Sequence, residues 1–423
     1  VINSVLHNTS FFEKFNLILL FLLPFTLAIS ILVTEIFSSL IGIFAIIWIY
    51  KNQKNLEILQ NIKIPIYAII LFYLIILISL GFSYNFNKSF LPSFFYFSYL
   101  LLSLGIFILI YKFEPTLKLV LISLMLLLLS IVIDSGIELL KINKYLGFSL
   151  ETYRINAGST YFLTGFFDEE KKLGSFLARL APLIISLVIL LDIKLFNKYD
   201  IKIPILILIG VYIFLSSERV ALFLFTIFFI FLLKIFQKKL LILFFSFLAI
   251  SSLVLTQPKL VEKYVYATLS QLQIIDQYQM YKINEETREL ERVKILKLIS
   301  LSSFSNFKYM SEEHEKLLKS GIVIFKENPL TGTGLKNYHR YCKNIKEERS
   351  LDIKCSSHPH NTYTQILSDI GIFGGLIIGS IFLYILFFNL KILFIKKPSK
   401  LVKSFYVLNL GIILNLMPFI PSG

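Results

Sequence analysis

The residue types best suited to chemistry lie in segment 356–361, Ser-Ser-His-Pro-His-Asn, where a long polar stretch runs into an apolar one. An imidazole exchanges protons near neutral pH, so His360 at this junction is a candidate general base working at membrane depth. Asn361 can orient that imidazole or a substrate hydroxyl, or it can cap the helix that follows. His314, earlier in the same polar stretch, is a supporting candidate.

Three arginines close to apolar segments form a second group of candidates: Arg154, Arg179 and Arg219. A guanidinium group is planar, permanently charged and able to bind phosphate through paired hydrogen bonds. A cation at membrane depth is costly unless it lines a wet cavity or meets an anion, so these residues predict an anionic ligand. The alternative is that each arginine reaches the lipid headgroups or an internal ion pair, such as Arg219 with Glu218.

The elements that must position these residues are membrane-spanning helices. Apolar residues make up 56% of the chain and charged residues 16%, against roughly 25% in soluble domains. Several apolar runs approach or exceed the roughly 20 residues that cross a bilayer as a helix, and we expect about eleven spans. This pattern predicts an all-α fold, a polytopic membrane helix bundle of about 11–12 transmembrane helices with one large, mainly helical outer loop. The expected spans lie near residues 15–33, 35–50, 64–80, 90–111, 117–133, 174–191, 202–216, 220–236, 240–256, 367–390 and 403–418.

The apolar runs divide the chain into three regions. Residues 1–256 are expected to form a transmembrane bundle of about nine helices, with an outer loop near 134–173. Residues 257–366 form the large outer loop, and residues 367–423 hold the last transmembrane helices. The chain begins at Val1 without Met and stops just after the last apolar run, so we expect a truncated chain that lacks a further span.

The basic residues predict the orientation. Lysines gather in every second short loop, and the positive-inside tendency puts those loops and the amino terminus in the cytoplasm. The loops at 134–173 and 257–366 then lie outside, and none of the seven arginines falls in a cytoplasmic loop. The net charge of +15 is therefore a topology signal and an attraction to anionic lipids, which excludes a nucleic-acid-binding function.

The large outer loop contains further structural signals. Residues 260–282 and 285–299 have apolar positions at helical spacing, and a third helix is expected to begin near Ser311 and to end at Pro329. Cys342 and Cys355 are the two cysteines of the chain, and in an oxidising compartment we expect them to form a disulfide. A Cys/His metal site is the alternative, although the spacing resembles no zinc module.

Glycines gather after the histidine segment, among them Gly371, Gly374 and Gly375. Small residues on one face of a membrane helix let another helix approach closely, so we expect these glycines to serve helix packing.

The pattern of His360-Asn361, nine residues, Gly371, two residues and Gly374 resembles the hallmark of the O-antigen ligase family and of the related O-antigen polymerases. The stretch from Arg154 to Arg179, the Ser-Glu-Arg sequence that ends at Arg219 and segment 325–334 are similar to further elements of that family.

This resemblance implies a membrane glycosyltransferase at the periplasmic face of the bacterial inner membrane. The implied reaction is inverting, metal-independent and free of cofactors, and it moves a glycan from undecaprenyl diphosphate to lipid A-core or to another glycan. Such a transfer needs a base for the acceptor hydroxyl and positive charge for the departing diphosphate. His360 suits the first role, and Arg219, Arg179 and Arg154 suit the second.

Two alternatives remain beside a ligase. An O-antigen polymerase uses the same donor, and the single large late loop and the His-Asn motif favour the ligase over it. An anion or solute transporter is the alternative from another class. Transporters place ionisable groups near the middle of the membrane, whereas these spans are almost free of charge apart from Arg179.

Overall fold

The computed structural model describes residues 10–53, 57–60, 62–113, 115–144, 163–167, 172–195, 199–236, 242–243, 245–246, 248–250, 275–283, 290–298 and 312–418. Within these residues, seven helices are long and apolar enough to cross a membrane, judged by length and composition. The prediction of an all-α polytopic membrane bundle is confirmed. Most of the expected span at 240–256 and most of the loop at 134–173 lie outside the described residues.

One of the candidate spans consists of two consecutive helices that meet at a single residue, Tyr96. In chain order the long helices are α2 (Phe11–Ile29), α3 (Ile31–Lys51), α5 (Lys63–Gly81), α6 with α7 (Phe86–Phe95 and Phe97–Lys112), α8 (Thr116–Lys144), α9 (Leu173–Leu190) and α17 (Thr362–Leu393). The shorter helices beside them are α4 (Glu57–Gln60), η3 (Gly165–Phe167), α10 (Lys202–Leu215), α11 (Arg219–Leu232) and α18 (Lys400–Asn415).

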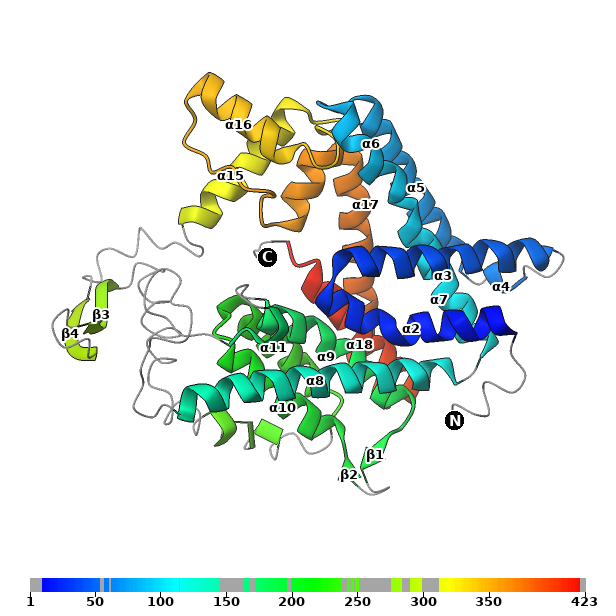
Figure 1. Ribbon diagram of the computed structural model, residues 1–423, viewed down its shortest axis with the longest axis horizontal. Coiled ribbons are helices and arrows are strands. Elements are labelled where there is room, and N and C mark those ends of the chain that lie inside the picture. The colour runs from blue at the N-terminus through cyan, green and yellow to red at the C-terminus, as the bar shows by residue number, and fades with distance from the viewer. Residues whose placement is uncertain are drawn as a thin grey trace.

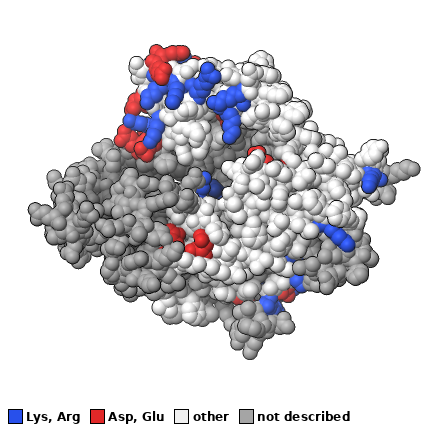
Figure 2. Space-filling view, viewed as in Figure 1, with Lys and Arg blue, Asp and Glu red and all other residues white. Residues whose placement is uncertain are grey.

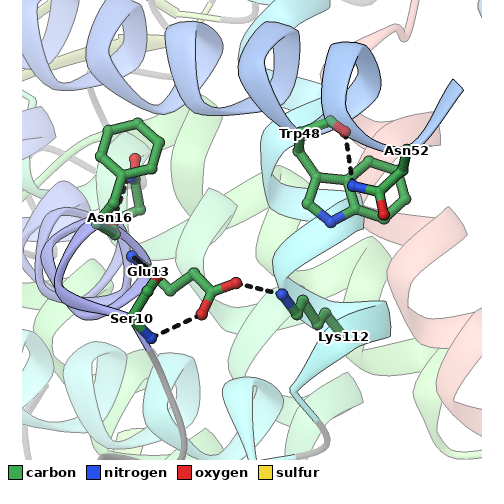
Figure 3. A network of polar contacts seen from close by, with 7 residues as sticks. Ser10, Glu13, Asn16, Trp48, Asn52 and Lys112 are labelled. Carbon is green, nitrogen blue, oxygen red and sulfur yellow. Dashed lines mark hydrogen bonds and ion pairs between the residues drawn. The ribbon is translucent and has the colours of Figure 1, made fainter.

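Capping residues set the boundaries of the first two spans. Ser10 and Glu13 form a capping box at the start of α2, and Glu13 also receives the Lys112 ammonium group at the end of α7 (Figure 3). The first span was expected to continue to residue 33. It ends at Ile29 instead, because Ser30 adopts an extended conformation and caps α3 by accepting a hydrogen bond from the Val33 amide.

Helix α9 lies at the centre of the lower half of the molecule in Figure 1. It is 72% buried over its most apolar window, whereas the other candidate spans are at most 39% buried. It contacts α8, α10, α11 and α18, and apolar side chains from these helices form the largest core cluster. The start of α9, at Leu173 and Gly174, therefore belongs to the best-packed part of the bundle.

The expected outer loop, residues 257–366, is helical over much of 312–349 but also contains strands. Helices α15 (Glu312–Glu327) and α16 (Tyr338–Arg349) lie at the top of Figure 1, against α6 and the start of α17. Their buried side chains, among them Ile324 and Tyr338, form a small core that includes the Cys342–Cys355 disulfide, in which the Cα atoms are 5.7 Å apart. The structure thus contains the disulfide expected from the two cysteines.

Two predicted helices of the outer loop are wrong where the structure describes them. Residues Ile275–Ile283 form strand β3 and Leu290–Leu298 form strand β4, and the two pair as an antiparallel hairpin. The pairing has two register shifts, within 275–277 and 279–281. Such irregularities break the strict alternation of a strand, which is why the apolar spacing resembled a helix. A second small hairpin joins β1 (Lys194–Leu195) to β2 (Tyr199–Asp200).

Helix α17 is kinked at Gly371, where φ is 73° and ψ is −167°. Segment 329–334 runs along this kink: the Thr333 amide donates to the Ser368 carbonyl at 2.8 Å, and the Ile372 amide donates to the Pro329 carbonyl at 2.8 Å. A Cβ atom on Gly371 would lie 2.1 Å from the Leu330 carbonyl oxygen. The glycine therefore permits both the kink and the close approach of this segment.

The expected role of the glycines in helix–helix packing is wrong. At Gly371 the close neighbour is an irregular segment rather than a helix. At Gly374 and Gly375 an added Cβ atom would meet side chains of α17 itself, Ile370 and Leu367. The prediction assumed a straight helix with these glycines on one face, and the kink at Gly371 removes that regularity.

Replacing Gly371 with alanine is expected to destabilise the protein by about 1–3 kcal/mol, because the backbone conformation at this residue is essentially restricted to glycine. Thermal unfolding of the purified protein in detergent measures the effect. Gly379→Ala is the matched control on the same helix, since no atom lies within 4 Å of an added Cβ there. Equal unfolding temperatures for the two variants would contradict the role of the kink.

Candidate active site

His360 stands at the start of α17 in an unusual backbone conformation. Its φ is 53°, in the left-handed region that non-glycine residues rarely adopt. The next residue, Asn361, is buried and caps the helix, because its Oδ1 accepts hydrogen bonds from the Tyr363 and Thr364 amides at 3.1 Å each. Of the three roles considered for Asn361, the structure shows the cap. Strained conformations of this kind concentrate at functional sites.

The start of α17 is also attached to the segment that follows α18. The Asn361 Nδ2 group donates to the Pro418 carbonyl at 2.6 Å, and the Tyr363 hydroxyl donates to the Leu416 carbonyl at 2.8 Å. These bonds fix the position of the helix end that carries His360.

Three imidazoles gather at this helix end. The ring centroid of His360 is 4.1 Å from that of His358 and 6.0 Å from that of His314. His358 and His360 are neighbours in sequence, whereas His314 comes from the first turn of α15. The His358 Nδ1 atom forms a hydrogen bond of 2.9 Å with the Ser357 hydroxyl. The packing of α15 on α17 thus brings the supporting candidate His314 next to the candidate base.

Burial and positive charge keep two of these imidazoles neutral. Burial lowers the pKa of His314, and the nearby charges of His360 and Arg219 lower it further, against an opposite contribution from Glu313. Burial also lowers the pKa of His358, with further contributions from His360 and Lys336. Because its charge contributes to the lowered pKa of His314, Arg219 lies within electrostatic reach of the three histidines.

Arg219 begins α11, directly after the tight turn that connects it to α10. Ser217 in this turn has a φ of 60°, and the following Glu218 points to the start of α9. The Glu218 carboxylate accepts hydrogen bonds from the Gly174 amide at 2.6 Å, the Ser175 amide at 3.0 Å and the Ser175 hydroxyl. A carboxylate is favoured there because the first amides of a helix lack partners within it. Glu218 therefore fixes the turn that presents Arg219.

Gly174 makes this contact possible. A Cβ atom at Gly174 would lie 2.3 Å from the Ser216 hydroxyl oxygen and 3.1 Å from the Glu218 side chain. Burial raises the pKa of Glu218, while its hydrogen bonds with Ser175 and Gly174 and the charge of Arg179 act in the opposite direction. The turn and the start of α9 thus form one polar unit beside Arg219.

Arg179 lies about one turn further along α9, on the same side as Glu218. Its Nε group donates to the Asn415 Oδ1 atom of α18 at 2.8 Å, and its charge interacts with Glu218. The side chain is exposed. The structure therefore brings Arg179 within electrostatic reach of Glu218, the residue that directly precedes Arg219. Arg154, the third arginine of the group, lies outside the described residues.

Two supporting residues were missed from the sequence. Glu218 was considered only as an ion-pair partner for Arg219, although the start of α9 has no side-chain cap of its own and needs an acceptor from elsewhere. Asn415 was not considered, yet an amide within an apolar helix is itself a signal because it requires a polar partner. No group of three or more His, Cys, Asp or Glu side chains is arranged to hold a metal ion within the part of the chain that the structure describes.

Lowering the pH from 7 to 5 is expected to destabilise the folded protein through the histidine cluster. The pKa values of His314 and His358 are lowered in the folded state, so the unfolded chain binds more protons. This contribution to stability is present above the unfolded pKa of about 6.5 and is lost as the pH falls below it. Thermal unfolding at both pH values measures the loss, which should be smaller in the double variant His314→Gln/His358→Gln. An equal loss in both proteins would contradict this role.

Comparison with known proteins supports the family suggested by the sequence. A search of curated proteins finds no match to the chain. The family model Wzy_C, described as O-Antigen ligase, matches residues 204–379. The matched segment contains Arg219, His314, His360 and the glycine at the kink of α17, and it ends before Asn415. The chain therefore contains a domain of the O-antigen ligase family across residues 204–379.

Proposed function

We propose that the protein is an O-antigen ligase-like inverting glycosyltransferase. It moves a glycan from undecaprenyl diphosphate to lipid A-core at the periplasmic face of the inner membrane, and it needs no metal. The single observation that carries this proposal is the convergence of the two candidate groups, because the charge of Arg219 acts on His314, whose ring is 6.0 Å from that of His360. This supports a shared site for the candidate base and the candidate phosphate-binding cation, which are 141 residues apart in sequence (360 minus 219).

The chemistry assigns one role to each group. The His360 imidazole removes the proton of the acceptor hydroxyl while the oxygen attacks the anomeric carbon of the donor sugar. The bond between that carbon and the diphosphate oxygen breaks, and the diphosphate leaves with the electron pair. Attack from the face opposite the leaving group inverts the anomeric centre. His314 and His358 stay neutral at pH 7, so the proton moves to His360 without two further cations beside it.

The arginines stabilise the leaving group. Charge develops on the diphosphate as the bond breaks, and preorganised cations stabilise that charge more in the transition state than in the ground state. Arg219 is held by the Glu218 turn, and Arg179 is held by Asn415. The Arg179 guanidinium is therefore ordered before the donor binds, and the backbone that carries Arg219 is fixed.

A polymerase that joins two carrier-linked chains needs the same base and the same cations. The two functions differ in the acceptor, and the single large late loop together with the His-Asn motif favours the ligase.

The glycan phenotype of a deletion strain tests the proposal and separates the two functions. Undecorated lipid A-core together with accumulated long carrier-linked chains supports a ligase. Lipid A-core that carries single repeats indicates a polymerase. Normal glycans would contradict both, and complementation with the intact gene serves as the control.

A further inference from the structure

A cavity lined by lysines lies at the opposite end of α17 from His360. Its volume is about 260 Å³, and it is bounded by the end of α11, the end of α17, the connecting segment 394–399 and the start of α18. Four lysines line it: Lys234, Lys396, Lys397 and Lys403. The cavity is therefore separate from the candidate active site, by the length of a helix that is long enough to cross a membrane.

The positive charge of this cavity is not balanced by acidic groups of the described residues. Across that part of the chain, none of the four lysines forms an ion pair with a carboxylate. The nearby Lys400 differs, since its Nζ atom is 2.6 Å from an Asp192 carboxylate oxygen. Four like charges around one hollow repel one another, and an anion in the hollow relieves that repulsion. Figure 2 colours Lys and Arg blue on one face of the molecule, and basic side chains lie along its lower edge as well as around the top.

The inner wall of the cavity is apolar. Phe236, Ile392 and Tyr406 line it and are buried in the bundle. Tyr406 is fixed in place, because its hydroxyl donates to the Phe231 carbonyl at 3.2 Å and its own carbonyl accepts from the Asn389 side chain at 3.2 Å. The cavity therefore combines a rigid apolar wall with cationic side chains.

Large apolar side chains are exposed beside the cavity. Phe394 is 85% exposed and Leu401 is 53% exposed. A ligand with a phosphate group and an acyl chain would place its anion among the lysines and its chain against this apolar surface. The volume lies just below the range of about 300–1,000 Å³ found for pockets that enclose drug-sized ligands, so it suits one headgroup rather than a whole lipid.

We propose that this cavity binds a phosphate-bearing anion, and that the anion is the headgroup of an anionic phospholipid. The alternating lysine-rich loops predict that this end of α17 faces the cytoplasm, where anionic lipids attract basic segments. Basic pockets between transmembrane helices on that side are suited to such headgroups. The site therefore lies on the other side of the membrane from the proposed glycan transfer and does not depend on that function.

Lipid binding to the full chain purified in detergent tests the proposal. Phosphatidylglycerol or phosphatidylcholine is titrated in, and bound lipid is counted by native mass spectrometry. The variant Lys396→Gln/Lys397→Gln removes two exposed lysines of the cavity. We expect it to bind phosphatidylglycerol about 25-fold more weakly, from roughly fivefold for each lysine. The control Lys391→Gln/Lys400→Gln removes the same charge from neighbouring positions outside the cavity and should bind like the unchanged protein.

Each outcome of this experiment decides the proposal. Equal weakening in the two variants would show a diffuse attraction to basic residues and overturn it. Equal binding of the two lipids by the unchanged protein would also overturn it. A separate titration with inorganic phosphate distinguishes the source of the anion. Displacement of the lipid by millimolar phosphate keeps the phosphate site but overturns the assignment to a headgroup, whereas resistance to displacement supports that assignment.

Discussion

Replacing His360 with asparagine is expected to lower glycan transfer by on the order of 10²–10⁴, the range of a lost general base. Asparagine is the informative replacement because the φ of 53° at this position is tolerated by its short polar side chain. The folded structure is therefore retained while the group that takes the proton is removed. The measurement is transfer from a carrier-linked donor to the acceptor by purified protein, with thermal unfolding recorded in parallel.

Two further variants separate the chemical role of His360 from its position. His360→Gly also satisfies the backbone conformation, and we expect added imidazole to restore part of its transfer activity because a free base can occupy the space. His339→Ala is the matched control. The His339 ring makes no contact with the rings of His314, His358 and His360 among the described residues, and its Nδ1 atom lies 2.9 Å from the Ser356 carbonyl oxygen. Full transfer by His360→Asn would remove this residue as the base.

Arg219→Lys is expected to lose nearly as much transfer activity as Arg219→Ala, by about 10²–10³. Lysine keeps the charge but cannot form the paired hydrogen bonds by which a guanidinium group holds a diphosphate. The loss should appear in kcat more than in KM for the donor, because the charge on the leaving group grows in the transition state.

Arg340→Lys provides the control for the arginine prediction. Arg340 is exposed on α16, in the same outer region, and it undergoes the same chemical change. We expect its transfer activity to stay unchanged. Full activity of Arg219→Lys at saturating donor would show that a point charge is sufficient, and the diphosphate role would then fail in the form proposed here.

The candidate residues of the site could be predicted from the sequence because few residue types can act as a base or bind a phosphate group. His360 and Arg219 stand out as titratable or cationic groups at the edges of apolar runs. Their convergence could not be read, because it depends on how α15 and the turn before α11 are placed by packing contacts distant in sequence. The same limit explains Glu218, whose role is visible only when the start of α9 lies beside it.

The fold shows a similar division. Long apolar runs predicted the spans well, since membrane-crossing length and backbone hydrogen bonding leave few alternatives. Residues 275–283 and 290–298 were misassigned because strand pairing with an irregular register has no clean period. Gly371 was taken for a packing residue because composition does not reveal a positive φ, which depends on the segment 329–334 that runs beside it.

The four residues from 415 to 418 contact both Arg179, a proposed cation of the site, and the helix start that carries His360, the proposed base. Asn415 binds Arg179, while the Leu416 and Pro418 carbonyls bind Tyr363 and Asn361 at the start of α17. This short segment thus links Arg179 of α9 to the start of α17, where the proposed base His360 stands, through contacts in which α15 takes no part. The spacing between the proposed base and the proposed cation is therefore set by the spans and the segment after α18 rather than by helices α15 and α16.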